Sequence, residues 1–324
     1  MADFMQMIRW MRPANSPALD MFCEIYLRPV FGAPDDFGNY IKIINNKDGS
    51  APNLCFTSHS DTVHSVDGIQ DLVVEGNFVH SVGEDCLGAD CTTGVWLVLE
   101  MIREKVPGVY VVHDSEEVGC VGSRSLVKDR PSWLDDIDAV ISFDRKGTDS
   151  IVTHQMGLRT ASNEFAKSLA LALNMPDMKP DDTGVYTDSN EYADLIKECT
   201  NISVGYYGQH TMGETQDIDF MVKLRNALVS ADWAKLVFKR DPMDTTEDPY
   251  HNYYDKFKYD SRFTDGWTFD KDSMLTLVKE YPEDIAEYLY NLGFSSEDIA
   301  SELGLGSSNT YLSRFFEQDE RKAG

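Results

Sequence analysis

The chain has 324 residues, of which 42% are hydrophobic, and it carries a formal net charge of −26. This length is enough for one large domain, or for one domain and a small second one. The negative charge argues against nucleic acid and anionic membrane surfaces as partners, because both would repel the protein.

Strand and helix patterns alternate along the first 240 residues. Apolar positions at helical spacing fill residues 1–32. Strands are predicted at 39–44, 54–58, 109–112, 139–143 and 202–207, with a hairpin at 72–82 around Gly76-Asn77. Helices are predicted at 90–103, 159–174 and 215–239. This alternation predicts a layered α/β domain with a largely parallel sheet.

The composition changes near residue 241. Residues 241–267 are rich in Asp, Tyr and Pro and show no clean period, whereas helical patterns return at 271–321. We therefore expect a catalytic domain at 1–240, an acidic Tyr/Pro-rich linker at 241–270 and a small helical segment at 271–324.

Within the last segment, residues 294–312 resemble a helix-turn-helix unit. The surroundings are acidic, whereas DNA binding needs a basic footprint. A docking or oligomerisation module and simple packing against the first domain are the alternatives to DNA binding.

Cysteine usage and hydrophobicity predict the compartment. The six cysteines are scattered and form no C-x-x-C pair, which favours reduced thiols over a disulfide framework. Residues 1–12 lack the apolar core of a signal peptide, and no stretch approaches the roughly 20 apolar residues of a membrane span. The sequence therefore predicts a soluble, cytoplasmic protein.

Histidines and acids follow the predicted strands, each near the point where a strand ends. The carboxyl ends of strands in an open α/β sheet share one rim, where ligands bind. Two histidines with several carboxylates suit zinc or a similar divalent ion. The candidate residues are His59, Asp61, Asp90, Glu116, Glu117, Asp144 and His210.

Two features within this set point to chemistry. Glu116 and Glu117 are adjacent acids at a strand end, which makes sense if one binds a metal and the other acts as a base on water. Asp61 lies two positions after His59, so it could accept the free ring N–H of that histidine. Each residue taken singly also has an ordinary explanation: a surface histidine, a helix N-cap at Asp90 or a loop acid.

Four motifs carry a resemblance to a known family. They read H-S-D-T-V at 59–63, L-G-A-D at 87–90, S-E-E-V-G at 115–119 and F-D-R at 143–145. As an ordered set they resemble the motifs of co-catalytic di-zinc exopeptidases. That clan includes peptidase T, tripeptidases, leucyl-type aminopeptidases and related deacylases. Residues 200–210 resemble the last-ligand region of the clan, so the resemblance covers roughly residues 35–238.

The resemblance implies a fold and a role for each residue. The fold would be three-layered, with a mixed, mostly parallel sheet and helices on both faces. Two Zn²⁺ per chain are implied, with Co²⁺ or Mn²⁺ as alternatives. His59 and Asp144 would hold one ion, Glu117 and His210 the other, Asp90 would bridge them, Glu116 would be the general base and Asp61 the partner of His59.

One departure from the clan is visible. Many members insert a lid or dimerisation domain between the ligands that correspond to Asp144 and His210. Here the two are only 66 positions apart, so a lid of ordinary size does not fit.

The leading hypothesis is a zinc metallopeptidase that removes residues from the N-terminus of short peptides. Two alternatives stay open: a deacylase or amidohydrolase on a small N-acyl substrate, and a non-catalytic binding protein on the same scaffold. A homo-oligomer or a protein partner would use the C-terminal helices.

Three further residues have two readings each. Asp188 could orient a substrate amine or His210, or cap a helix. Arg145 could bind a substrate carboxylate or form a surface salt bridge. Tyr206 could line a pocket or pack in the core.

Overall fold

The computed structural model describes residues 2–244, 278–279 and 282. Residues 1–248 form one compact unit, and residues 249–324 belong to a second. Apart from residues 241–244, 278–279 and 282, the predicted linker at 241–270 and the predicted helical segment at 271–324 lie outside the described residues. The domain boundaries therefore stay predictions.

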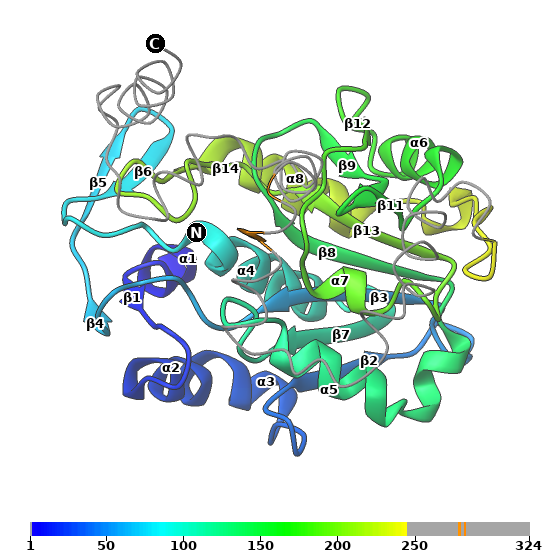
Figure 1. Cartoon of the computed structure of the whole chain (residues 1–324), viewed down its shortest axis with the longest axis horizontal. Helices are drawn as coiled ribbons and strands as arrows, with labels where there is room; N and C mark the ends of the chain where they lie inside the picture. Colours follow the sequence, from blue (N-terminus) through cyan, green and yellow to red (C-terminus); the bar gives the residue numbers. More distant parts are fainter. Residues whose placement is uncertain (1, 245–277, 280–281, 283–324) are drawn as a thin grey trace, which may run out of the picture. The chain divides into compact units, whose positions relative to one another are not determined.

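A seven-stranded sheet is the centre of residues 2–244, with its strands in the order β12-β9-β13-β8-β3-β7-β2 (Figure 1). Neighbouring strands from β13 to β7 are parallel, as are β12 and β9, while β13–β9 and β2–β7 are antiparallel. The bounds are β2 (Tyr40–Ile44), β3 (Leu54–His59), β7 (Gly108–His113), β8 (Ala139–Arg145), β9 (Ser150–Val152), β12 (Lys179–Asp181) and β13 (Glu198–Ser203).

A smaller sheet and two strand pairs complete the β-structure of residues 2–244. The smaller sheet has the order β14-β15-β6-β5, and the pairs are β1–β4 and β10–β11. The bounds are β1 (Trp10–Met11), β4 (Gly68–Ile69), β5 (Leu72–Glu75), β6 (Phe78–Ser81), β10 (His154–Gln155), β11 (Leu158–Arg159), β14 (Tyr206–Tyr207) and β15 (Thr215–Asp217).

Helices cover both faces of the large sheet (Figure 1). Alternate strand residues point to opposite faces. Phe56 and Ile141 therefore join the core with α4, α6 and α8, while Cys55 and Val140 join the core with α5 and the segment that follows α7. The bounds are α1 (Ala2–Met7), α2 (Pro17–Phe22), η1 (Cys23–Leu27), α3 (Arg28–Phe31), α4 (Ala89–Arg103), α5 (Val121–Asp129), η2 (Ser132–Asp136), α6 (Asn163–Ala172), α7 (Asp188–Glu191), α8 (Ile218–Ser230) and η3 (Trp233–Lys235).

These layers confirm the predicted three-layer α/β fold with a mostly parallel sheet. Between Asp144 and His210 the chain forms strands and helices of the same unit, so the prediction that no lid domain is inserted there is also confirmed. Within the described part of the chain, none of the helices combines the length and the apolar character needed to cross a membrane.

Several predicted boundaries were wrong, each for a local reason. The helix predicted at 159–174 begins at Asn163, because Ser162 caps it by accepting a hydrogen bond from the Phe165 backbone. The helix predicted at 215–239 starts with strand β15, and Asp217 caps α8 in the same way. The strand predicted at 202–207 is broken at Gly205, where φ is +97°. The helix predicted at 1–32 is interrupted by β1.

Candidate metal centre

The predicted ligands come from five separate segments. Three of them belong to the carboxyl ends of neighbouring strands in the large sheet: His59 ends β3, Glu117 follows β7 and Asp144 lies near the end of β8. Asp90 lies at the start of α4, and His210 follows β14 of the smaller sheet. The structure brings together atoms of all five predicted ligands in overlapping groups whose donor atoms lie within 4.8 Å of one another. The groups are His59 with Asp90, Cys91 and Asp144; His59 with Glu116 and Glu117; and Asp90 with Glu117 and His210.

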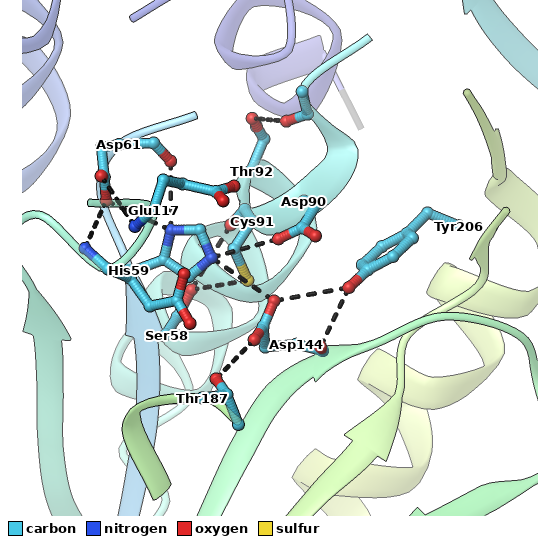
Figure 2. A network of polar contacts seen from close by, with 12 residues as sticks. Ser58, His59, Asp61, Asp90, Cys91, Thr92, Glu117, Asp144, Thr187 and Tyr206 are labelled. Carbon is cyan, nitrogen blue, oxygen red and sulfur yellow. Dashed lines mark hydrogen bonds and ion pairs between the residues drawn. The ribbon is translucent and has the colours of Figure 1, made fainter. Parts of the chain in front are cut away.

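His59 lies at the centre of the polar network in Figure 2. Its Nδ1 is 3.1 Å from the Asp61 carbonyl oxygen and 3.3 Å from Asp61 Oδ1. Its Nε2 is 3.1 Å from Asp90 Oδ1 and 3.4 Å from Asp144 Oδ1. If Nδ1 donates its proton to Asp61, the Nε2 lone pair faces two carboxylate oxygens.

His210 repeats this arrangement on the other side of Asp90. Its Nε2 is 3.3 Å from Asp90 Oδ2 and 3.2 Å from Glu117 Oε2. The two oxygens of Asp90 are therefore divided between the two histidines, which is a bridging position. Glu117 Oε1 is buried and has no hydrogen-bond partner in the part of the chain that the structure describes.

The carboxylates around His59 and His210 favour a positive charge at each histidine. Burial acts to lower the pKa of His59, but Asp144, Asp61 and Asp90 raise it well above its usual range. Burial likewise acts against protonation of His210, yet its hydrogen bonds to Asp90 and Glu117 raise its pKa to about 11. A lone pair aimed at two carboxylates needs either a proton or a metal cation between them. The donor set thus fits divalent metal ions.

The acid pair lies in a tight turn between β7 and α5. Gly119 and Cys120 donate their backbone N–H groups to the Glu116 carbonyl oxygen, both at 2.9 Å. Asp61 also holds this turn. Its Oδ1 accepts a hydrogen bond from the Glu116 backbone N–H at 3.0 Å, and its Oδ2 accepts one from the Glu117 backbone N–H at 3.1 Å. The sequence indicated Asp61 as a partner of His59 but missed this second contact.

Burial raises the pKa of Glu116 well above its usual range, and Asp144 acts in the same direction while His59 opposes it. Glu116 and Glu117 both line a cavity of about 320 Å³. The other acids in its wall are Asp90 and Asp144, and His210 lies at the same opening.

Three side chains that the sequence did not single out as ligand supports hold Asp144. Thr187 donates its hydroxyl to Asp144 Oδ2 at 2.7 Å, and Tyr206 donates to the Asp144 carbonyl oxygen at 2.9 Å (Figure 2). Asn201 accepts from the Asp144 backbone at 2.9 Å and donates back to its carbonyl at 2.8 Å. Tyr206 is thus buried with a fixed hydroxyl, and it also lines the cavity of about 320 Å³.

Glu214 was missed entirely. It is 1% exposed and accepts hydrogen bonds from the backbone of the loop that carries Asp90. Its position four residues after His210 was the only signal in the sequence, and that signal is weak.

Of the two other candidates, Arg145 has structural partners, whereas Asp188 Oδ1 is buried without a hydrogen-bond partner among the described residues. Arg145 donates to Asp181 Oδ2 at 3.0 Å and to Thr183 Oγ1 at 2.8 Å, so its guanidinium is already paired. Asp188 begins α7, with Thr187 as the preceding cap position, and is 1% exposed. Burial raises the pKa of Asp188 to about 8.

Comparisons with known proteins concern the family and the fold. The family model described as Peptidase family M28 matches residues 39–264. No curated protein matches the sequence. Among solved structures, a tripeptidase from Staphylococcus aureus is 14% identical, with 70% of this chain and 95% of that chain covered and a TM-score of 0.59. The aminopeptidase PepT from Bacillus cereus is 16% identical, with 71% and 96% covered and a TM-score of 0.55. The TET1 peptidase of Pyrococcus horikoshii is 13% identical, with 71% and 99% covered and a TM-score of 0.54. At these identities the likeness is one of fold.

Proposed function

Because the chain belongs to peptidase family M28, and is therefore a metal-dependent peptidase, we propose that it is a two-zinc aminopeptidase acting on short peptides. One observation carries the proposal: His59 and His210 each aim Nε2 at two carboxylate oxygens, and Asp90 contributes one oxygen to each pair. His59, Asp144 and Asp90 would hold one zinc ion, and Glu117, His210 and Asp90 the other.

Zinc ions bound there would polarise the scissile carbonyl and lower the pKa of water. Glu116 stands beside them as the general base: its carboxylate takes up a proton and delivers it to the leaving amine. Burial raises the pKa of Glu116 in the metal-free site, and two bound cations would lower it again, so that the carboxylate is free to take up the proton. Asp61 fixes the turn that presents Glu116 and accepts from His59 Nδ1, which leaves Nε2 free for a metal.

The cavity is lined by acidic and basic side chains together. Asp90, Glu116, Glu117 and Asp144 lie in its wall, and so do Arg145 and Lys146. Two bound zinc ions would neutralise the acids, so the preference for a free N-terminus over an acylated one is supported by the likeness to the aminopeptidase PepT. The volume of about 320 Å³ suits one side chain and the adjoining backbone.

Metal analysis and a substrate panel test the proposal together. Protein purified without added metal is expected to hold close to two zinc ions per chain, and a chelator should abolish hydrolysis. His210→Gln should lose about one ion, whereas the control His80→Gln on β6 should keep both. Peptides with a free N-terminus should be cleaved, while N-acetylated peptides and N-acyl amino acids should not. Hydrolysis of the N-acyl amino acids alone would favour the deacylase alternative, and metal-free protein without hydrolysis would favour a binding protein.

Location and assembly are part of the same proposal. All six cysteines are buried free thiols, which supports a reducing compartment such as the cytoplasm. The Pyrococcus TET1 peptidase can assemble into a tetrahedron or a large octahedral shell, which supports a homo-oligomer here. Light scattering of the purified chain would test this, and a single mass equal to 36.6 kDa would contradict it.

A further inference from the structure

One buried carboxylate joins the two loops that carry Asp90 and His210. Glu214 Oε2 accepts hydrogen bonds from the backbone nitrogens of Leu87 at 2.9 Å and Gly88 at 2.8 Å. Its Oε1 accepts from the backbone nitrogen of Asp90 at 3.0 Å. Three amides thus satisfy a charge that is expensive to bury, so the carboxylate is fixed in place.

The Asp90 loop has no support of this kind from its own helix. Gly88, at the N-cap of α4, offers no side-chain acceptor, and Asp90 and Cys91 have non-helical backbone angles. The amides at the start of α4 are therefore bonded by a residue more than 120 positions away in the sequence. Glu214 accepts the hydrogen bonds of the backbone N–H groups of Leu87, Gly88 and Asp90, which α4 itself leaves without acceptors.

At its other end, Glu214 closes the turn that presents His210. The Glu214 backbone donates to the Thr211 carbonyl at 3.1 Å, and Thr211 Oγ1 donates to the Gly208 carbonyl at 2.7 Å. His210 lies inside this turn with φ at +61°. A further hydrogen bond, from Thr93 Oγ1 to Gln216 Oε1 at 2.5 Å, connects α4 to β15, the strand that begins directly after Glu214.

We infer that Glu214 is a positioning residue that sets the separation between Asp90 and His210, and thereby the affinity of the metal position between them. The contact it controls is the 3.3 Å approach of His210 Nε2 to Asp90 Oδ2. Glu214 makes this adjustment through backbone amides alone, without touching a metal or a substrate. The inference rests on the proposed function, because it takes the two histidines as metal ligands.

Glu214→Gln is the informative variant. Glutamine keeps one carbonyl oxygen but puts an NH₂ group where the second carboxylate oxygen was, and NH₂ cannot accept from an amide. If the oxygen stays on Leu87 and Gly88, the NH₂ group faces the Asp90 amide, donor against donor. The loop should then shift at Asp90 itself.

A second buried glutamate provides a matched control. Glu198 is 0% exposed, and it accepts from the backbone amides of Ser162, Lys239 and Arg240, at 2.6, 2.6 and 3.0 Å. It joins two segments just as Glu214 does, but it lies at the start of β13, away from the carboxyl edge. Glu198→Gln should therefore reproduce the loss of stability without reproducing the effect on metal binding.

The test is zinc titration of metal-free protein against a chromogenic chelator, together with the visible absorption of the Co²⁺-loaded form. We expect Glu214→Gln to weaken one of the two binding steps about 10- to 100-fold and to change the Co²⁺ spectrum. Added zinc should restore much of the lost peptidase activity. Glu198→Gln should keep both dissociation constants within about twofold of wild type.

Each outcome decides the question. Unchanged zinc affinities in Glu214→Gln, with a melting temperature lowered as in Glu198→Gln, would overturn the inference while leaving the proposed function intact. Wild-type protein that binds no metal would overturn both. If Glu214→Gln does not fold, Glu214→Asp replaces it: the shorter carboxylate keeps the charge but cannot reach both groups of amides, so the same weakened step is expected and its absence counts against the inference.

Discussion

Asp61 Oδ1 lies 3.0 Å from the backbone nitrogen of Glu116, so the carboxylate next to His59 also holds the acid pair in place. Its second oxygen accepts from Glu117 in the same way, at 3.1 Å. One fully buried side chain thereby fixes a proposed ligand and the proposed base relative to His59.

Asp61→Asn is expected to lower kcat/KM about 10- to 100-fold and to weaken zinc binding by a similar factor. The asparagine NH₂ group would face a backbone donor in the turn, so Glu116 and Glu117 should both move. Asp35→Asn is the control, because Asp35 Oδ1 also accepts from two backbone amides, those of Phe37 and Asn39, in a loop. Equal kinetics in the two variants would refute the role given to Asp61.

Glu116→Gln should retain both metal ions but lose about 10²- to 10⁴-fold in kcat, since a glutamine cannot accept the proton. Metal content and steady-state kinetics on a free-amine peptide measure the two effects separately. Glu75→Gln on the exposed strand β5 removes the same charge elsewhere and should behave like wild type. Full activity of Glu116→Gln would exclude it as the base.

The buried side chain of His113 makes the stability of the fold depend on pH. It is fully buried: Nδ1 lies 2.9 Å from Asn39 Oδ1, and the Tyr192 hydroxyl lies 3.1 Å from Nε2. Burial, and then the charge of His59, lower the pKa of His113 to about 3. The unfolded chain has the ordinary pKa of about 6.5 and so binds more protons between these values.

The stability conferred by neutral His113 is therefore complete above about pH 6.5 and is lost progressively as the pH falls toward 3. His113→Gln should be less stable at pH 7, because both hydrogen bonds change. Its free energy of unfolding should then fall less steeply below pH 6.5, by up to about 1.4 kcal/mol per pH unit. Urea denaturation of the metal-free proteins at several pH values measures this difference. Parallel pH curves for wild type and variant would contradict it.

Gly94→Ala should destabilise the protein by about 1–3 kcal/mol or more. A Cβ there would lie 2.2 Å from the Phe143 carbonyl oxygen and 2.6 Å from Ser58 Oγ. These two residues immediately precede Asp144 and His59 in the sequence. The better helix propensity of alanine offsets only about 1 kcal/mol. In Gly83→Ala the nearest atom is 3.5 Å away, so thermal melting of that control should match wild type.

The sequence predicted those features of the fold and the site that leave a short local pattern of residues. Apolar runs marked β3, β7 and β8, and the polar residues after them could be read as a shared rim because strand ends in such sheets converge. Contacts between distant segments left no such pattern. Nothing around Glu214 shows that it bonds to Leu87, and nothing near His113 points to Tyr192, 79 positions away. Helix ends failed for another reason: Ser162 and Asp217 are ordinary polar residues until their cap geometry is seen.

The spread of the proposed metal ligands along the chain has a consequence for how activity arises. The segments that meet at the rim run from His59 to His210, so a shared pair of cations would cross-link segments spread from residue 59 to residue 210 of the folded unit, which ends at residue 248. Such a cross-link closes long loops, which disfavours the unfolded chain rather than one local element. On the proposed mechanism it would also set an order in synthesis, because a nascent chain that has not yet released residue 210 would lack a proposed ligand. Hydrolysis of peptides would then begin only when the last of the proposed ligands has reached the site.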